Sequence, residues 1–245
     1  MSTRKRVGVA ALLPVWVFVS FMAVQLLSGL ALSGLIALGL PIDQINPSVF
    51  GATLGAIVYV LVLAVTIAGP WLVLKHRTSL HDLGLHRLPT WKDIGIAPVG
   101  FVAYLFLTAV FALIAQHTLT FIDYNQAQET GFENLSLRYE YILAFVTLVI
   151  VAPLAEEILF RGYLFGKLRK VSPLWVSILI TSVLFGIVHF AWNVGIDVFA
   201  LSIVMCLVRV WSGSLWPSIL IHMSKNFIAF YFLFINPALL TTIGG

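Results

Sequence analysis

Three short polar clusters interrupt long hydrophobic stretches in the second half of the chain, and their residue types could carry out hydrolysis. The clusters are Glu156-Glu157-x-x-x-Arg161, Phe185-x-x-x-His189 and His222-x-x-x-Asn226. A carboxylate, two imidazoles and a carboxamide form a set that can activate water and stabilise negative charge. A charged side chain near the centre of a membrane-spanning helix costs about 2.5–3.5 kcal/mol on insertion scales, so such residues usually have a function.

The two adjacent acids of the first cluster are expected to have different roles. Glu157 and Arg161 are four residues apart on a helix and can form an ion pair, so both are predicted to support the site. Glu156 lies about 100° further round the helix and is free to face a cavity. Taken alone, such a cluster near a helix end often has no catalytic role, because its long charged side chains simply extend to the membrane surface.

The other two clusters complete the set of predicted catalytic residues. His222 and Asn226 are four residues apart, so both project from one helix face. Glu156 is predicted to take a proton from water, and neutral His189 or His222 to form a hydrogen bond with an oxyanion. Asn226 is predicted to donate its amide to the developing negative charge.

The same residues raise the question of a metal. Glu156, His189 and His222 could hold a divalent ion such as zinc, because Glu and His are ordinary zinc ligands. However, His-x-x-x-Asn is not the His-Glu-x-x-His signature of zinc peptidases, and asparagine is a poor zinc ligand. The residues alone leave both a metal-bound and a metal-free site open.

The elements that must position these residues are membrane-spanning helices. Of the 245 residues, 60% are hydrophobic and only 10% are charged, whereas soluble domains have about 25% charged residues. The sequence therefore predicts an all-α, polytopic membrane helical bundle that forms one integral membrane domain over residues 1–245. Seven spans of sufficient length are expected, the last four of which form the catalytic core at residues 139–235: 9–40, 49–74, 94–115, 139–160, 174–192, 196–211 and 215–235.

Several features outside the clusters are expected to be structural. Pro14 is expected to mark a surface turn before the first span, which is too long for a cleavable signal and is interpreted as an uncleaved anchor. The segment 78–91 is expected to be a surface loop or an amphipathic turn, with His76, His81 and His86 as solvated residues. Cys206 is the only cysteine, so an intramolecular disulfide is excluded and a small core residue is expected.

The distribution of charge predicts the orientation of the chain. Basic residues concentrate before the first span, after the second and fourth spans, and at the end of the sixth, whereas the intervening loops are mainly acidic. This alternation places the N-terminus in the cytoplasm and, with seven spans, the C-terminus outside. The net charge of +4 is spread over short loops, so membrane lipid is the expected partner and nucleic acid is not.

The three clusters are expected at one depth in the membrane. Glu156 and His189 are equally far along the chain from the helix-breaking pair at 172–173, so an antiparallel hairpin brings them to the same height. His222 reaches nearly the same level if the outer turn lies near residues 194–195 and the inner turn near Gly213. Separated motifs that meet in one layer are typical of a functional site.

The motifs Glu156-Glu157-x-x-x-Arg161, Phe185-x-x-x-His189 and His222-x-x-x-Asn226 resemble those of the CPBP family, the CAAX protease and bacteriocin-processing (Abi) membrane proteases. The resemblance covers residues 139–232. It implies an intramembrane endopeptidase with Glu156 as general base, His189 and His222 as catalytic or metal-associated residues, Asn226 in an oxyanion hole, and Glu157 and Arg161 in support. Both a metalloprotease and a metal-independent glutamate mechanism are argued for this family.

The expected substrate is a membrane-associated or lipid-modified peptide or protein. The compact architecture with short loops favours a bacterial plasma membrane over a role in eukaryotic prenyl processing. Two alternatives remain: a proton-coupled carrier in which Glu156, His189 and His222 relay protons, and a catalytically inert immunity protein that uses the pocket to bind a peptide.

Overall fold

Long apolar helices dominate the protein. The computed structural model describes residues 3–75, 77–124, 132 and 135–239, so His76, Glu129 and Glu133 lie outside the described residues. Within these ranges, six helices are long and apolar enough to cross a membrane, and a shorter apolar helix lies between the fourth and the fifth. The prediction of an all-α membrane bundle of about seven helices is confirmed.

The first three spans precede the motifs. The first is α1 (Thr3–Ala37). The second is formed by α2 (Pro47–Leu63), the π-helical segment η2 (Ala64–Ala68) and α3 (Gly69–Leu74), and a short 3-10 helix, η1 (Ile42–Gln44), connects it to the first. The third is α5 (Trp91–Thr118).

The remaining spans carry the three motifs. The fourth continues through α6 (Arg138–Phe145), η3 (Val146–Val151), α7 (Ala152–Glu157), η4 (Ile158–Leu164) and α8 (Phe165–Leu168). It is followed by the shorter α9 (Leu174–Ile187), by α10 (Trp192–Ser212), and by α11 (Trp216–Phe230) with η5 (Tyr231–Ile235).

Two local expectations were wrong. Pro14 lies inside α1 and does not mark a turn, because flanking apolar residues continue the helix on both sides of it. The turn after α9 comprises residues 188–191, before the expected position at 194–195, and α10 already begins at Trp192. As a result α9 has 14 residues and rises only ~21 Å, so this hairpin turns before it has crossed the hydrocarbon core.

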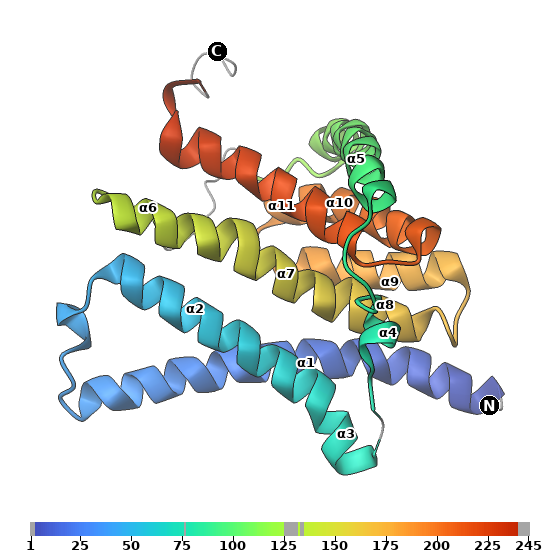
Figure 1. The fold of residues 1–245 in the computed structure, drawn as a ribbon, viewed down its shortest axis with the longest axis horizontal. Helices are drawn as coiled ribbons and strands as arrows, with labels where there is room; N and C mark the ends of the chain where they lie inside the picture. Colours follow the sequence, from blue (N-terminus) through green and yellow to red (C-terminus); the bar gives the residue numbers. More distant parts are fainter. Residues whose placement is uncertain (1–2, 76, 125–131, 133–134, 240–245) are drawn as a thin grey trace.

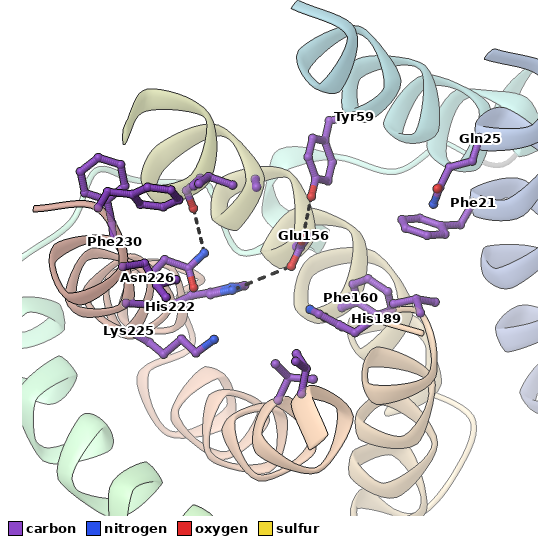
Figure 2. A pocket seen from close by; sticks show the side chains of 18 residues that line it. Phe21, Gln25, Tyr59, Glu156, Phe160, His189, His222, Lys225, Asn226 and Phe230 are labelled. Atoms are coloured by element: carbon purple, nitrogen blue, oxygen red, sulfur yellow. Dashed lines mark hydrogen bonds and ion pairs between the residues drawn. The ribbon is translucent and has the colours of Figure 1, made fainter. Parts of the chain in front are cut away.

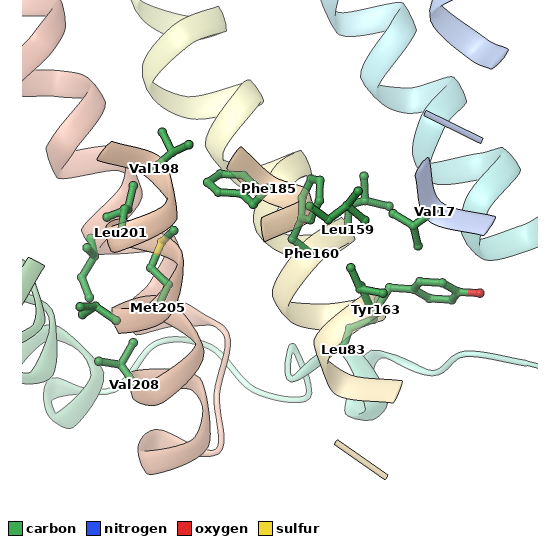
Figure 3. Packing of buried hydrophobic residues seen from close by; sticks show 14 of the residues in the cluster. Val17, Leu83, Leu159, Phe160, Tyr163, Phe185, Val198, Leu201, Met205 and Val208 are labelled. Atoms are coloured by element: carbon green, nitrogen blue, oxygen red, sulfur yellow. The ribbon is translucent and has the colours of Figure 1, made fainter. Parts of the chain in front are cut away.

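The helices are arranged around the segment from α7 to α8. In Figure 1 the connection between α8 and α9, the connection between α10 and α11, and the start of α1 lie at one end of the bundle, whereas the start of α6 lies at the other. The core joins Leu159 and Phe160 of η4 to Phe185 of α9 and to the inner face of α10, which includes Leu201 and Met205 (Figure 3). Cys206 is fully buried in α10, so its expected place in the core is confirmed.

The segment between the second and third spans folds against this core. It contains the single-turn helix α4 (Leu80–Leu83), where the Ser79 hydroxyl accepts a hydrogen bond from the backbone N–H of Asp82 and Leu83 is buried. His81 and His86 are exposed. The expectation of an amphipathic turn with solvated histidines is confirmed for these residues.

Candidate active site

One cavity of about 530 Å³ receives side chains from all three motifs (Figure 2). Glu156, His189, His222 and Asn226 all line it. The other lining residues come from α1, α2, the fourth span, the end of α9, α10, α11 and η5: Phe21, Gln25, Tyr59, Leu148, Ala152, Phe160, Val188, Val194, Val198, Lys225, Ala229, Phe230, Leu233 and Phe234. Residues that are far apart in the sequence therefore share one hollow inside the bundle.

Glu156 presents its carboxylate to this cavity. Its Oε1 accepts a hydrogen bond of 2.6 Å from the hydroxyl of Tyr59, which projects from α2. Its Oε2 lies 3.8 Å from Nε2 of His222, and 15% of the side chain is accessible. One oxygen is thus fixed by the protein, while the other remains available to a bound molecule.

Glu157 points the other way and is fully buried with Arg161. Nη1 of Arg161 donates to Oε1 of Glu157 at 2.9 Å, as the spacing of four residues indicated. The guanidinium of Arg161 also lies over the ring of Phe185, 4.0 Å from its centroid. The pair therefore connects the fourth span to α9, and its supporting role stays a prediction.

The same carboxylate orients His222. Nδ1 of His222 lies 3.0 Å from Oε1 of Glu157, which also accepts from Arg161. Because an ionised carboxylate can only accept, Nδ1 must carry the hydrogen. Nε2 of a neutral His222 is then a bare acceptor, and it is this atom that faces Glu156.

His189 lies on the turn after α9, and its orientation is fixed in a similar way. Its Nδ1 lies 2.7 Å from the carbonyl oxygen of Phe185, so Nδ1 is the donor and Nε2 of the neutral ring is an acceptor. The next residue, Phe190, has a φ of 53°, and the chain reverses there into α10. In these tautomers neither neutral imidazole can donate to an oxyanion through Nε2, which corrects that detail of the expected chemistry.

Asn226 lies one helical turn beyond His222 on α11. Its Nδ2 donates to the carbonyl oxygen of Leu148 in η3 at 2.8 Å. An amide nitrogen has two hydrogens, so this bond holds the side chain in place and leaves a second N–H for another acceptor.

Three other polar residues in the cavity wall were not predicted as site residues. Tyr59 and Gln25 lie in the first two spans, where each interrupts a run of apolar residues. Lys225 also lines the cavity, with its Nζ 3.6 Å from Oδ2 of Asp197 in α10. Neutral polar residues inside apolar spans were the available signal for Tyr59 and Gln25.

The side chains do not form a ready metal site. Among the residues that the structure describes, no group of three His, Cys, Asp or Glu side chains is arranged so that it could hold a metal ion. Glu156 and His222 approach each other, but one oxygen of Glu156 already accepts from Tyr59. The expected metal-ligand set of Glu156, His189 and His222 therefore does not fit, and no step of the chemistry is assigned to a metal.

Comparison with known proteins agrees with this architecture. Residues 138–228 match the family model described as "Type II CAAX prenyl endopeptidase Rce1-like". Over these residues, the chain is similar to the CPBP family. This is a family of membrane proteases, and the matched residues contain every motif that lines the cavity.

The similarity to individual proteins is moderate. The chain is 26% identical to the membrane-embedded CAAX protease MroQ of Staphylococcus aureus, over 74% of this chain and 76% of MroQ. It is 32% identical to an uncharacterized 24.3 kDa protein of Escherichia coli, over 38% of this chain and 45% of that protein. The protein YyaK of Bacillus subtilis is 29% identical, over 56% of this chain and 46% of YyaK. No solved structure matches the chain.

Proposed function

We propose that the protein is an intramembrane endopeptidase that hydrolyses a peptide bond with a water molecule activated by Glu156. The observation that carries this proposal is the separation of 3.8 Å between Oε2 of Glu156 and Nε2 of His222 at the cavity wall. Both atoms are acceptors when His222 is neutral, so one water molecule can donate a hydrogen bond to each. The lone pairs of that water are then directed away from both groups, toward a substrate carbonyl.

The chemical step follows from this arrangement. As the water oxygen bonds to the carbonyl carbon, one water proton passes to Glu156, and the carbonyl oxygen becomes an oxyanion. The second N–H of Asn226, which the bond to Leu148 leaves free, can donate to that oxyanion. The carbon–nitrogen bond then breaks, the proton on Glu156 passes to the leaving nitrogen, and a carboxylic acid and an amine are released.

His189 is given a different part in this scheme. Because Nε2 of the neutral ring accepts hydrogen bonds, it can bind an N–H of the substrate backbone at the cavity wall. If it becomes protonated, it can instead donate to the oxyanion. The buried Glu157 and Arg161 keep His222 in the tautomer that the reaction requires.

The proposed substrate is a membrane-associated or lipid-modified peptide or protein. The cavity lies among helices that span the membrane, and the relative MroQ is named a CAAX protease. The proposed location is the bacterial plasma membrane, with the N-terminus in the cytoplasm.

The test begins with the substrate. Proteins that accumulate in cells with Glu156→Gln relative to wild type are identified by proteomics, and a peptide from such a protein is incubated with the purified enzyme in detergent. Cleavage is expected for wild type and for His117→Ala, a change at an exposed histidine that does not line the cavity. Glu156→Gln and His222→Ala are each expected to abolish cleavage while the variant protein still folds.

Other outcomes would favour the alternatives. Full turnover in both variants would overturn the protease mechanism. Uptake into proteoliposomes that depends on a proton gradient and is lost in Glu156→Gln would favour a carrier. Tight binding of the accumulating peptide without cleavage by the wild type would favour an inert binding protein.

A further inference from the structure

Arg209 is a buried cation that has no carboxylate partner among the described residues and does not line the catalytic cavity. Arg209 is in the last turn of α10, and only 6% of its surface is accessible. Its Nε is enclosed and has no hydrogen-bond partner. Among the residues that the structure describes, no carboxylate forms an ion pair with Arg209.

The other buried cation among the described residues has a partner. Arg161 pairs with Glu157, whereas Arg209 forms no such ion pair. A buried charge that lacks a partner carries a desolvation cost of several kcal/mol. The charged side chain that acts electrostatically on Arg209 is Arg169, which has the same sign and increases the cost.

The backbone around Arg209 is shaped to admit its guanidinium. Gly84 follows α4 with a φ of 81°, and a Cβ atom at this position would overlap the terminal and Nε atoms of Arg209. The carbonyl oxygen of Gly84 accepts from the backbone N–H of Leu215, which fixes the loop between α10 and α11 against it. The guanidinium is thus held in a built niche and is not a surface side chain that happens to be covered.

The niche lies at the level expected for lipid headgroups. Trp211 lies with Arg209 in the last turn of α10, and Trp91 begins α5, after the segment that contains Gly84. These tryptophans are 62% and 87% exposed, as tryptophans at a membrane interface commonly are. The connection between α8 and α9, which carries Arg169, lies at the same end of the bundle as the end of α10 (Figure 1). A phosphate group at this level would meet two arginines, and arginine binds phosphate with paired, charge-assisted hydrogen bonds.

We propose that Arg209, together with Arg169, forms a binding site for a phosphate monoester or diester, supplied by the headgroup of an anionic phospholipid. The anion supplies the negative charge that the described residues do not provide to Arg209. The site lies apart from the catalytic cavity, so its occupancy is expected to affect stability in the membrane and not the chemical step.

The experiment uses the full-length protein, delipidated in a neutral detergent. Thermal unfolding is followed during titration with phosphatidylglycerol, with phosphatidylcholine of the same acyl chains, and with inorganic phosphate at constant ionic strength. The variants are Arg209→Met and Arg169→Gln, and the control is Arg138→Gln, an exposed arginine at the first residue of α6.

Phosphatidylglycerol is expected to raise the Tm of wild type and of Arg138→Gln, and phosphatidylcholine is not. Its apparent affinity is expected to fall at least about tenfold in Arg209→Met, since one charge-assisted hydrogen bond is worth that factor or more. A smaller loss is expected in Arg169→Gln. If inorganic phosphate also protects wild type but not Arg209→Met, the phosphate site stands and its anion can come from solution.

A second readout separates an anion site from a structural arginine. Without lipid, Arg209→Met is expected to be as stable as wild type or more stable, because it removes a buried charge that lacks a partner. The proposal is overturned if phosphatidylglycerol protects Arg209→Met as well as wild type. It is also overturned if no phosphate compound protects wild type, or if Arg209→Met destabilises the lipid-free protein while Arg169→Gln binds lipid normally.

Discussion

Tyr59 of α2 donates a hydrogen bond of 2.6 Å to Oε1 of Glu156, although the two residues are 97 positions apart in the chain. This bond joins the two halves of the protein: α2 lies outside the segment that matches the protease family, and α7 lies within it. It leaves Oε2 as the oxygen that faces His222. The N-terminal half therefore contributes directly to the orientation of the proposed general base.

Removing this hydroxyl is expected to slow turnover without affecting the fold. In Tyr59→Phe the carboxylate loses a charge-assisted hydrogen bond worth about 1.5–3 kcal/mol, so kcat is expected to fall roughly 10- to 100-fold. The measurement is steady-state cleavage with the thermal midpoint as a check on folding. Tyr141→Phe is the matched control, because its hydroxyl bonds to the carbonyl of Leu135 outside the cavity. Equal kcat in both variants would show that Tyr59 does not orient the base.

The two adjacent glutamates are expected to respond differently to the same substitution. Glu157→Gln disrupts a fully buried ion pair and the contact to His222, and breaking a buried pair costs about 3–5 kcal/mol. Glu156→Gln leaves that pair intact and is expected to retain a near-native Tm while it loses activity. Thermal unfolding of both variants in one detergent compares them. A similar loss of Tm in the two would contradict the division into a catalytic and a supporting acid.

Much of this arrangement could be predicted from sequence because membrane burial imposes simple rules. Each span needs about 20 apolar residues, so hydropathy alone indicated the helices. Ionisable residues are costly inside a span, so Glu156, His189 and His222 were conspicuous. The spacing of four residues between Glu157 and Arg161 predicted the ion pair that the structure contains.

The other features of the site could not be predicted, because they depend on contacts between residues whose presence in a span is not energetically costly or whose position the sequence does not fix. The hydroxyl of Tyr59 is neutral, so it is tolerated within an apolar span, and its presence there does not by itself indicate a functional site. The turn after α9 contains no proline or glycine, and the chain reverses at Phe190, which has a positive φ. Lys225 could be placed in the cavity wall only from the structure, where its Nζ lies 3.6 Å from Oδ2 of Asp197 in α10.

Chelators are expected to leave turnover intact. In the described part of the chain no three potential ligands meet, and the proposed base can act on water without an ion. Purified protein is dialysed against EDTA and then 1,10-phenanthroline, its metal content is determined by mass spectrometry, and its cleavage rate is compared with that of an untreated sample. Loss of activity with the chelator and recovery with Zn²⁺ alone would contradict this prediction.

The orientation in the membrane can be tested independently of activity. The described ends of the chain, in α1 and after η5, lie at opposite ends of the bundle (Figure 1). Since basic residues concentrate at the end that contains the start of α1, a reporter fused after Gly245 is expected to be extracytoplasmic. Paired fusions to alkaline phosphatase and green fluorescent protein give opposite signals on the two sides. Fluorescence without phosphatase activity at this position would reverse the topology.

A close contact between α9 and α10 is expected to control the position of His189. A Cβ atom added at Gly195 would lie 3.2 Å from the carbonyl oxygen of Gly186, and one added at Gly186 would lie 3.0 Å from the carbonyl oxygen of Gly195. Gly195→Ala must therefore push apart the two helices that flank the turn with His189, at a cost of about 1–3 kcal/mol. Both Tm and kcat are expected to fall. Gly95→Ala is the control, because its added methyl group meets no atom within 4 Å and is expected to stabilise its helix by roughly 0.5–1 kcal/mol. If Gly195→Ala matches that control in stability and turnover, the close approach of the two backbones does not position His189.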